Sequence, residues 1–516
     1  MKTTVVDIMI MAATYAVGII LPIIVIIAAY RLLLHPLAGF PGPLPAKLTS
    51  AYTGFYAWRR CSHISTYRAF QKYGEITIAQ RLSPQHASSG AEEEARTSNT
   101  SVTARPDRPD SPESSCLLHC HRTPWELHRN KRKTVGPAIS ERAMRFFEQD
   151  MSQEVDIFLA LLLESSTKNE VVNMTPRCER LGVDVVGRLA FGFELKSQRE
   201  PTHRHVAEGI KARSAISSIY MSWPSLRILN PVITWLSPRH RETDKENLYK
   251  SLRTMIGSRM VLPKEAKHDF YAQVSGEMGP DELWSEAILI VGAGGSTTAT
   301  TMSAAFFYLS RNPLAYKCLC TEIRSRFSSA REISQGAQLS ACSYLRAVID
   351  ESLRLSTGTI SNWRIQAAPS IAAGEQLVVD GHVIAPGTEV ATNAYSFMRN
   401  PDYYPEPLAF RPERWLEGNE EQRATMRRAL IPFSLGSRSC AGQAMAYLEL
   451  SLALARTFWY FDFEKAPGEA GGLSEVPGAP GEFKLEDSTI VGHSGPNLMF
   501  RTRADYWREL MATSSS

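Results

Sequence analysis

The sequence predicts a mainly α-helical protein with small β-sheets (an α+β fold), built as one large domain behind an N-terminal transmembrane helix. Three observations support this prediction. An almost wholly apolar run covers 8–29, a second apolar and helix-like run covers 281–311, and no linker rich in Gly, Ser or Pro divides the chain after Arg129. The length of 516 residues would allow several domains, but an undivided chain favours a single one.

The first segment, 1–34, is predicted to be a membrane anchor. Its apolar run over 8–29 is long enough for a helix to cross a bilayer. A secretory signal peptide would have a shorter apolar core and a small-residue cleavage site. Basic residues such as Arg31 and Lys47 follow the run, whereas only Lys2 precedes it, so the positive-inside rule places the rest of the chain in the cytosol. A buried core helix is the alternative.

A proline-rich segment over 35–47 follows the anchor, and closely spaced prolines make a stiff, extended hinge. We expect the main domain to cover 48–505 and a C-terminal tail to cover 506–516. The net charge of +4 is mild and argues against a nucleic-acid-binding protein. The eight cysteines are scattered without the spacing of a disulfide framework, which fits a reducing compartment.

The segment 77–123 differs in composition from the rest of the chain. It is rich in Ser, Thr, Arg, Pro and Asp, shows little apolar periodicity, and is typical of disorder. A misplaced intron boundary or a frameshift in the gene is our first interpretation, and a genuine insertion is the second. Cys116, His119, Cys120 and His121 cluster here, but no second ligand pair follows at zinc-finger spacing.

The apolar run over 281–311 is typical of one long helix that begins with acidic residues. Three glycines lie at its centre, Gly292, Gly294 and Gly295, and each costs the helix roughly 1 kcal/mol relative to alanine. We therefore expect them to serve a function, by leaving room for a ligand and by loosening the helical hydrogen-bond ladder. A close helix crossing formed by small residues is the alternative interpretation.

The segment from Phe433 to Gly442 has the pattern F-x-x-G-x-R-x-C-x-G, which fits a loop around one thiolate. Cys440 can bind haem iron through sulfur, a ligand that favours O–O cleavage. Gly436 lets the backbone turn tightly close to a porphyrin, and Arg438 offers a planar cation for a haem propionate. Phe433 would pack against the sulfur face, and Gly442 would let the following helix lie close to the haem. The pattern predicts haem b (iron protoporphyrin IX) as cofactor.

Two shorter motifs precede this loop, E-x-x-R at 351–354 and P-E-R-W at 412–415. In this order, the three motifs resemble the cytochrome P-450 superfamily, and their style is similar to that of filamentous-fungal microsomal (class II) monooxygenases. The resemblance runs from 281 to about 463. It implies the cytochrome P-450 fold, a single large haem domain, and a single-pass protein of the endoplasmic reticulum membrane.

The resemblance assigns roles to the shorter motifs. Glu351 and Arg354 share a helix face at i and i+3. In the family, such a pair meets the arginine of P-E-R-W, here Arg414, in a cluster that holds the core together. The segment at the centre of the long helix aligns with the family pattern (A/G)-G-x-(D/E)-T-T. Thr297 would then hold and pass on protons, while Ser296 stands where the family usually has a carboxylate, so proton delivery takes another route or is less well coupled.

Further basic residues are expected to bind haem propionates. The family places a propionate-binding arginine on a strand, here Arg364. It also has an earlier helix with W-x-x-x-R or H-x-x-x-R, for which two registers compete. Trp125 and Arg129 fit the letters, whereas His128 and Arg132 have the expected distance to the following Pro-Ala-Ile-Ser segment. We favour His128 and Arg132, and a solvated helix face is the alternative for any of these side chains.

The resemblance implies a haem-thiolate monooxygenase that uses O₂ and electrons from NADPH–cytochrome P-450 reductase. The substrate would be a lipophilic small molecule, an intermediate of fungal secondary metabolism. Lys131, Lys133, Arg427 and Arg428 are candidates for a basic surface that meets the acidic reductase. Two other functions stay open at this point: a haem-thiolate isomerase or dehydratase that needs no reductase, and a catalytically impaired haem-binding product.

Overall fold

The protein is described by a computed structural model that covers 5–74, 125–229, 239–267, 269–276, 278–365, 377–379, 381–384, 389–477 and 479–513. Within these ranges some side chains are not described, among them those of 5–13, 125–127, 239–245 and 361–365. The atypical segment 77–123, with its cysteine and histidine cluster, lies outside the described residues. Compact packing divides the chain into two units, of which the larger covers Pro106–Ser218, Ile228–Asn362 and Thr392–Ser516.

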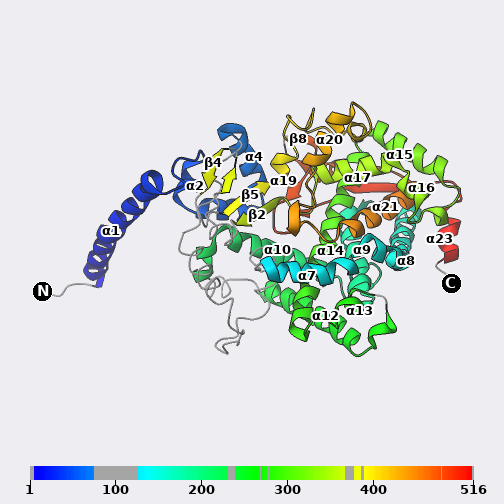
Figure 1. Cartoon of the computed structure of the whole chain (residues 1–516), viewed down its shortest axis with the longest axis horizontal. Helices are drawn as coiled ribbons and strands as arrows, with labels where there is room; N and C mark the ends of the chain where they lie inside the picture. The colour runs from blue at the N-terminus through cyan, green and yellow to red at the C-terminus, as the bar shows by residue number, and fades with distance from the viewer. Residues whose placement is uncertain are drawn as a thin grey trace. The chain divides into compact units, whose positions relative to one another are not determined.

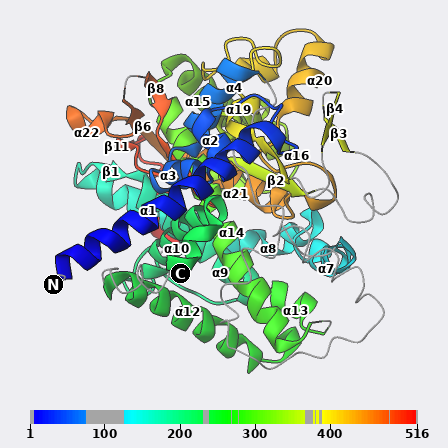
Figure 2. The ribbon, with the colours of Figure 1, turned by 90° about the vertical axis from the view of Figure 1, so that its left-hand side faces the viewer.

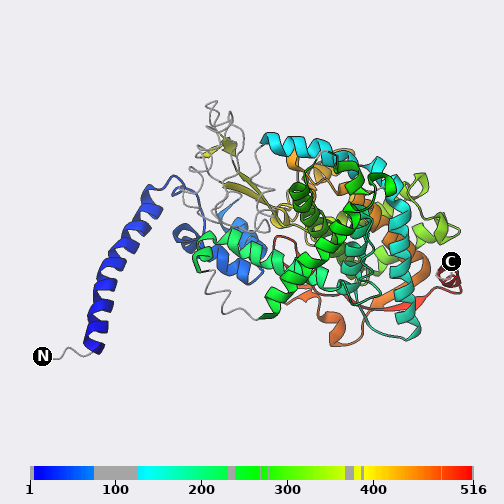
Figure 3. The same cartoon turned by 90° about the horizontal axis from the view of Figure 1, so that it is seen from below.

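The smaller unit contains the N-terminal helices. Helix α1 (Val5–Ala29) continues into a π-helical turn (Tyr30–Leu34), as the dark blue segment of Figure 3 shows. Three short helices follow: α2 (Leu44–Leu48), α3 (Ala51–Trp58) and α4 (Ser62–Tyr73). Strands β3 (Leu377–Val379) and β4 (His382–Ile384) pair as an antiparallel hairpin (Figure 2).

Across the part of the chain that the structure describes, no helix is long and apolar enough to cross a membrane. The predicted transmembrane span over 8–29 therefore stays a prediction, as do the boundaries of the hinge, the main domain and the tail.

The larger unit is mostly helical, as predicted, and carries small sheets. Its longer helices are α7 (Trp125–Ala138), α8 (Glu141–Thr167), α9 (Met174–Phe191), α10 (His205–Ser222), α12 (Arg239–Met260), α14 (Pro280–Leu309), α15 (Pro313–Arg326), α17 (Ser343–Leu355), α20 (Glu420–Ala429) and α21 (Gln443–Tyr460). The shorter helices are α13 (Phe270–Val274), α16 (Ala337–Ser340), α19 (Ala394–Phe397), α22 (Glu469–Gly472) and α23 (Arg508–Thr513). Helices α8, α9, α14 and α21 pack together around the core (Figure 1).

The sheets of the larger unit are antiparallel and lie late in the chain. A three-stranded sheet has the order β1 (Val172–Asn173), β11 (Asn497–Thr502), β6 (Phe461–Lys465). Phe500 pairs with Phe463 in its register, and both rings are buried in the core. Two-stranded pairs are formed by β7 (Glu475–Val476) with β8 (Ala479–Phe483) and by β9 (Leu485–Glu486) with β10 (Gly492–His493). One further pair, β2 (Ser361–Ile365) with β5 (Glu389–Asn393), belongs mostly to the smaller unit.

The glycines of α14 correct our first interpretation of them. A Cβ atom on Gly294 would lie 2.8 Å from Val186 Cγ2, and one on Gly295 would lie 3.0 Å from Val183 Cγ2, both on α9. The approach is equally close from the other side, because a Cβ on Gly182 would lie 2.1 Å from the carbonyl oxygen of Gly295. These glycines therefore serve a close helix crossing, which was the alternative interpretation. Helix α14 is continuous from Pro280 to Leu309, so the loosened hydrogen-bond ladder that we expected is absent from it.

Candidate active site

The cysteine loop is closed by its own backbone. The N–H of Cys440 donates to the carbonyl oxygen of Phe433 at 2.8 Å, and the N–H of Ser439 donates to that of Gly436 at 3.1 Å. Gly436 has φ of +77°, a left-handed conformation that favours glycine, so the tight turn explains this residue. Gly442 is the N-cap of α21, which begins at Gln443.

Cys440 is exposed, yet burial by the surrounding protein raises the pKa of its thiol. From these two properties we infer that the sulfur lies in a concave part of the surface, which we call the hollow. A backbone hydrogen bond from Gly442 and the charge of Arg132 act in the opposite direction and lower this pKa. Both influences stabilise a thiolate, which is the form that binds iron.

The ring of Phe433 packs on a partner that the sequence did not indicate. Its centroid lies 5.4 Å from that of Tyr447 on α21, and the two rings are tilted by 48°. Tyr447 in turn donates a hydrogen bond to Asp350 at 2.7 Å. The loop is thus attached to α21 and α17 through one aromatic pair, while the backbone of Phe433 holds the cysteine.

Three basic residues gather next to the cysteine loop. His128 and Arg132 lie one turn apart on α7, and Arg438 lies on the loop itself. Burial lowers the pKa of His128, and the charges of Arg438 and Arg132 lower it further. Arg132 also acts on Cys440. Helix α7 therefore presents the register that we favoured, His128 with Arg132, to the cysteine loop.

Arg364 lies in strand β2, but its side chain is outside the described part, so its role as a propionate ligand stays a prediction.

Lys131 was expected to contribute to a basic docking surface, and the structure places it in ion pairs instead. Its Nζ lies 2.8 Å from Glu286 and 3.1 Å from Glu282 on α14, so its charge is neutralised within the protein.

The centre of α14 presents one hydroxyl to open space and buries the other. Thr297 is half-buried and donates from Oγ1 to the carbonyl oxygen of Ala293 at 2.7 Å. Ala293 is exposed, and a Cβ on Gly292 would meet no atom within 4 Å, so this face of the helix borders a hollow. Ser296 is buried, and its Oγ has no hydrogen-bond partner among the described residues.

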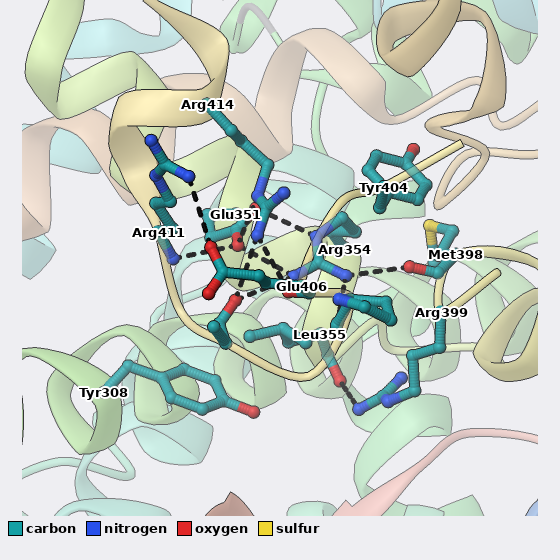
Figure 4. Close-up of polar contacts among 12 residues, drawn as sticks. Tyr308, Glu351, Arg354, Leu355, Met398, Arg399, Tyr404, Glu406, Arg411 and Arg414 are labelled. Atoms are coloured by element: carbon teal, nitrogen blue, oxygen red, sulfur yellow. Dashed lines mark hydrogen bonds and ion pairs between the residues drawn. The ribbon is translucent and has the colours of Figure 1, made fainter. Parts of the chain in front are cut away.

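Glu351, Arg354 and Arg414 meet in the buried cluster that the motifs predicted (Figure 4). Glu351 accepts from Arg354 Nε at 2.9 Å and Nη2 at 2.8 Å, and from Arg414 Nε at 3.0 Å. The two arginines therefore share one carboxylate. Both also donate to the carbonyl oxygen of Ala409, at 3.1 Å and 3.3 Å, which ties α17 to the segment before P-E-R-W.

Trp415 Nε1 and the backbone N–H of Arg411 complete the shell of Glu351, at 3.1 Å and 3.0 Å. Burial raises the pKa of Glu351, but the attraction of Arg354 and Arg414 outweighs it and leaves this pKa below its usual value. The cluster has no open side and touches no hollow, so its role is structural.

The residues around Cys440 fit a haem. A thiol at the wall of the hollow can reach iron. Beside it, the guanidiniums of Arg132 and Arg438 match the carboxylates of the two propionates, and the imidazole of His128 offers a further hydrogen-bond donor. Cations placed close together repel one another, so a site that collects them is suited to an anionic ligand.

Sequence reasoning missed two buried ionisable residues near α14. Glu449 on α21 is fully buried, and neither of its carboxylate oxygens has a hydrogen-bond partner in the described chain. His493 on β10 is buried against α14. The signal for Glu449 was an acidic residue in a mostly apolar helix whose other charged residue is Arg456, and His493 gave none.

Comparison with known proteins agrees with this geometry. The family model for cytochrome P-450 matches residues 102–477. The chain is 30% identical to the cytochrome P-450 monooxygenase poxM of Penicillium oxalicum, over 92% of this chain and 91% of the relative. It is also 30% identical to the cytochrome P-450 monooxygenase apf7 of Gibberella fujikuroi, over 94% and 97% respectively. The similarity to the cytochrome P-450 monooxygenase atnE of Emericella nidulans is 28%, over 95% and 97%.

Proposed function

The chain belongs to the cytochrome P-450 family and is a monooxygenase, and we propose that it oxidises a lipophilic small molecule of fungal secondary metabolism. One oxygen atom of O₂ enters the substrate and the other leaves as water. The two electrons come from NADPH through NADPH–cytochrome P-450 reductase. The cofactor is haem b, held by Cys440.

One observation carries this proposal: the thiol of Cys440 lines a hollow beside His128, Arg132 and Arg438. When bound, haem supplies a redox-active iron that activates O₂. The protein supplies the sulfur ligand, and its basic groups orient the propionates. Because these groups lie on both α7 and the loop, they would hold the propionates from two elements.

Thr297 is the residue proposed to hold a proton at the reaction centre. Its Oγ1 donates to Ala293 in the structure, and rotation about χ1 turns the same O–H toward the hollow. A hydroxyl both accepts and donates, so Thr297 can pass a proton on without carrying a charge. The isomerase and dehydratase alternatives lose support, since the matched relatives are named monooxygenases.

The reductase is proposed to dock where α20 presents basic side chains. Arg427 is exposed at the end of this helix, with Arg428 next to it. Exposed arginines attract an acidic partner and raise the rate of encounter. We also propose that 8–29 anchors the chain in the endoplasmic reticulum membrane with the haem domain in the cytosol. This part of the proposal rests on the apolar sequence and on the basic residues that follow it.

The proposed function is tested by expressing the full chain with a reductase. We expect the reduced, carbon monoxide-bound protein to show the red-shifted absorption of thiolate-ligated haem, and the Cys440→Ser variant to lose it. NADPH-dependent O₂ consumption should then appear when lipophilic candidate substrates are added. A wild-type protein that binds haem without the red-shifted band would overturn the assignment of Cys440.

A further inference from the structure

Three hydroxyls form a buried row on α14, next to the reaction centre. Ser296, Thr300 and Ser303 follow one another at i, i+4 and i+7, so they share one helix face, and all three are buried. His493 of β10 lies against this row. Its Nε2 is 3.0 Å from Ser303 Oγ, and its Nδ1 is 3.3 Å from Thr300 Oγ1. One imidazole therefore bridges two turns of the helix that carries Thr297.

The imidazole of His493 is neutral at physiological pH. Burial lowers its pKa, the charge of Lys211 lowers it further, and the result is about 3. A neutral imidazole donates from one nitrogen and accepts at the other, which is the requirement for passing a proton along. A histidinium could only donate.

Both tautomers of His493 find a complete set of partners. If Nδ1 carries the proton, it donates to Thr300, whose own O–H then donates to the carbonyl oxygen of Val491 at 3.1 Å. Ser303 then donates to Nε2. If Nε2 carries the proton, it donates to Ser303, which can turn its O–H to the sulfur of Cys178, while Thr300 donates to Nδ1. Each tautomer keeps both ring nitrogens hydrogen-bonded, and the two states differ in whether Thr300 donates to Val491 or to His493.

The outer end of the row reaches a charged pair at the surface. Lys211 Nζ lies 2.6 Å from Glu179, and the side chain of Lys211 is 37% exposed. The charge of Lys211 acts on His493, and that of Glu179 acts on Cys178, so this pair is the candidate point at which the row would exchange protons with solvent.

The inner end of the row is the unpartnered hydroxyl of Ser296. A buried polar atom without a protein partner indicates a bound water, which would also reach Thr300 one turn away. Ser296 precedes Thr297 directly and stands where the family usually has a carboxylate. The row thus ends one residue before Thr297, and the bound water would have to carry the proton from Ser296 to the Thr297 hydroxyl.

We propose that His493, together with Ser303, Thr300 and Ser296, conducts protons to Thr297 and replaces the carboxylate that this chain lacks. This inference rests on the proposed monooxygenase function. A proton enters at His493 Nε2 from Ser303, and the proton on Nδ1 leaves to Thr300. Nε2 then carries the proton, and the ring must rotate and the two hydroxyls reorient before the next proton is conducted. Protons alone move, and no bond to carbon and no electron pair is transferred.

The inference is tested with His493→Gln, whose amide keeps hydrogen bonds but cannot exchange a proton between two ring nitrogens. We expect product formed per NADPH to fall by about a hundredfold, the lower end of acid–base contributions, and hydrogen peroxide release to rise. The solvent deuterium isotope effect on turnover should increase. Turnover driven by added hydrogen peroxide should stay near the wild-type rate, since peroxide brings its own protons.

Two further variants separate conduction from packing. Phe483→Leu alters a ring whose centroid lies 5.8 Å from that of His493, and it should leave coupling unchanged. Ser296→Asp, added to His493→Gln, restores a carboxylate at the inner end and should recover most of the coupling. If His493→Gln behaves like Phe483→Leu, or if Ser296→Asp gives no recovery, the inference is wrong.

One measurement is independent of turnover. NMR of the ¹⁵N-histidine-labelled, diamagnetic ferrous carbon monoxide complex can follow this ring. The His493 signal is assigned because it is missing from the spectrum of His493→Gln. In the wild type, its chemical shift should stay that of a neutral, tautomer-averaged ring between pH 5 and 8. Protonation near the ordinary value of about 6.5 would overturn the inference. A wild-type protein that lacks the red-shifted carbon monoxide band would instead count against the proposed function, so the two failures are distinguishable.

Discussion

Two charged clusters in the larger unit differ in how their charges are balanced. Around Glu351, the guanidiniums of Arg354 and Arg414 surround one fully buried carboxylate, and an indole N–H and a backbone N–H complete its shell. Around Cys440, burial lowers the pKa of His128, and the charges of Arg438 and Arg132 lower it further. The first cluster is satisfied by the protein itself. The second places two guanidiniums beside an accessible thiol, an arrangement suited to an anionic ligand, which is why it identifies a binding site and the first does not.

The largest loss of stability is expected when the carboxylate of the first cluster is removed. Glu351→Gln leaves Arg354 and Arg414 buried beside a neutral amide. We expect the free energy of unfolding to fall by about 3–5 kcal/mol, the cost typical of an uncompensated buried charge. Urea denaturation followed by circular dichroism measures this loss. The matched control is Glu420→Gln, whose carboxylate meets Arg423 at the surface and should matter little. A loss as small as that of the control would contradict the structural role of the cluster.

Glu449 shows what burial does to a carboxyl without a cation. It is as buried as Glu351, but no arginine lies beside it among the described residues. Burial raises its pKa from 4.5 to about 8. The folded protein therefore keeps a proton that the unfolded chain loses, and stability should decrease as pH rises from 4.5 to 8, by up to about 1.4 kcal/mol per pH unit. Glu449→Gln should remove this part of the slope. Thermal unfolding of both proteins across this pH range is the measurement, and parallel curves would show that Glu449 titrates normally.

The second cluster is tested by removing one of its cations. Arg132→Ala takes away a charge that acts on both His128 and Cys440. We expect haem to dissociate about tenfold faster, as for the loss of one charge-assisted hydrogen bond. Transfer of haem to apomyoglobin measures this rate. Lys133→Ala, an exposed residue on the same helix, is the control and should retain haem like the wild type. A stable, haem-retaining Arg132→Ala protein would show that its charge is not used for the cofactor.

The smallest effect is expected for the surface charges of α20. Arg427→Glu and Arg428→Glu should raise the reductase concentration needed for half-maximal turnover by a few fold at low salt, and the difference should shrink as salt is added. Arg423→Gln, whose guanidinium is engaged by Glu420, is the matched control. Turnover that is insensitive to both reversals would place the reductase on another surface.

Much of the candidate site could be predicted because its chemistry lies in short segments. Cys440, Gly436 and Arg438 are within five residues of one another, so their spacing carries the loop geometry. Glu351 and Arg354 share one helix face for the same reason. The sequence left two registers open, Trp125 with Arg129 and His128 with Arg132. The charge of Arg132, which acts on both His128 and Cys440, favours the second.

Other features depend on residues far apart in the chain. Gly294 and Gly295 had two possible explanations, and only the approach of Gly182 on α9 selected the helix crossing. Lys131 looked like a surface charge until Glu282 and Glu286 were found beside it.

The amino-acid sequence alone determined the family, the sulfur ligand and the buried glutamate–arginine cluster, because local spacing sets which side chains share a turn or a helix face. The tertiary structure decided which groups lose water and which neighbours they meet. His493 lies 193 residues from Thr300, and nothing in the sequence joins them. Their contact exists because β10 packs on α14, and the same packing excludes the solvent that would otherwise keep the imidazole titrating in its usual range.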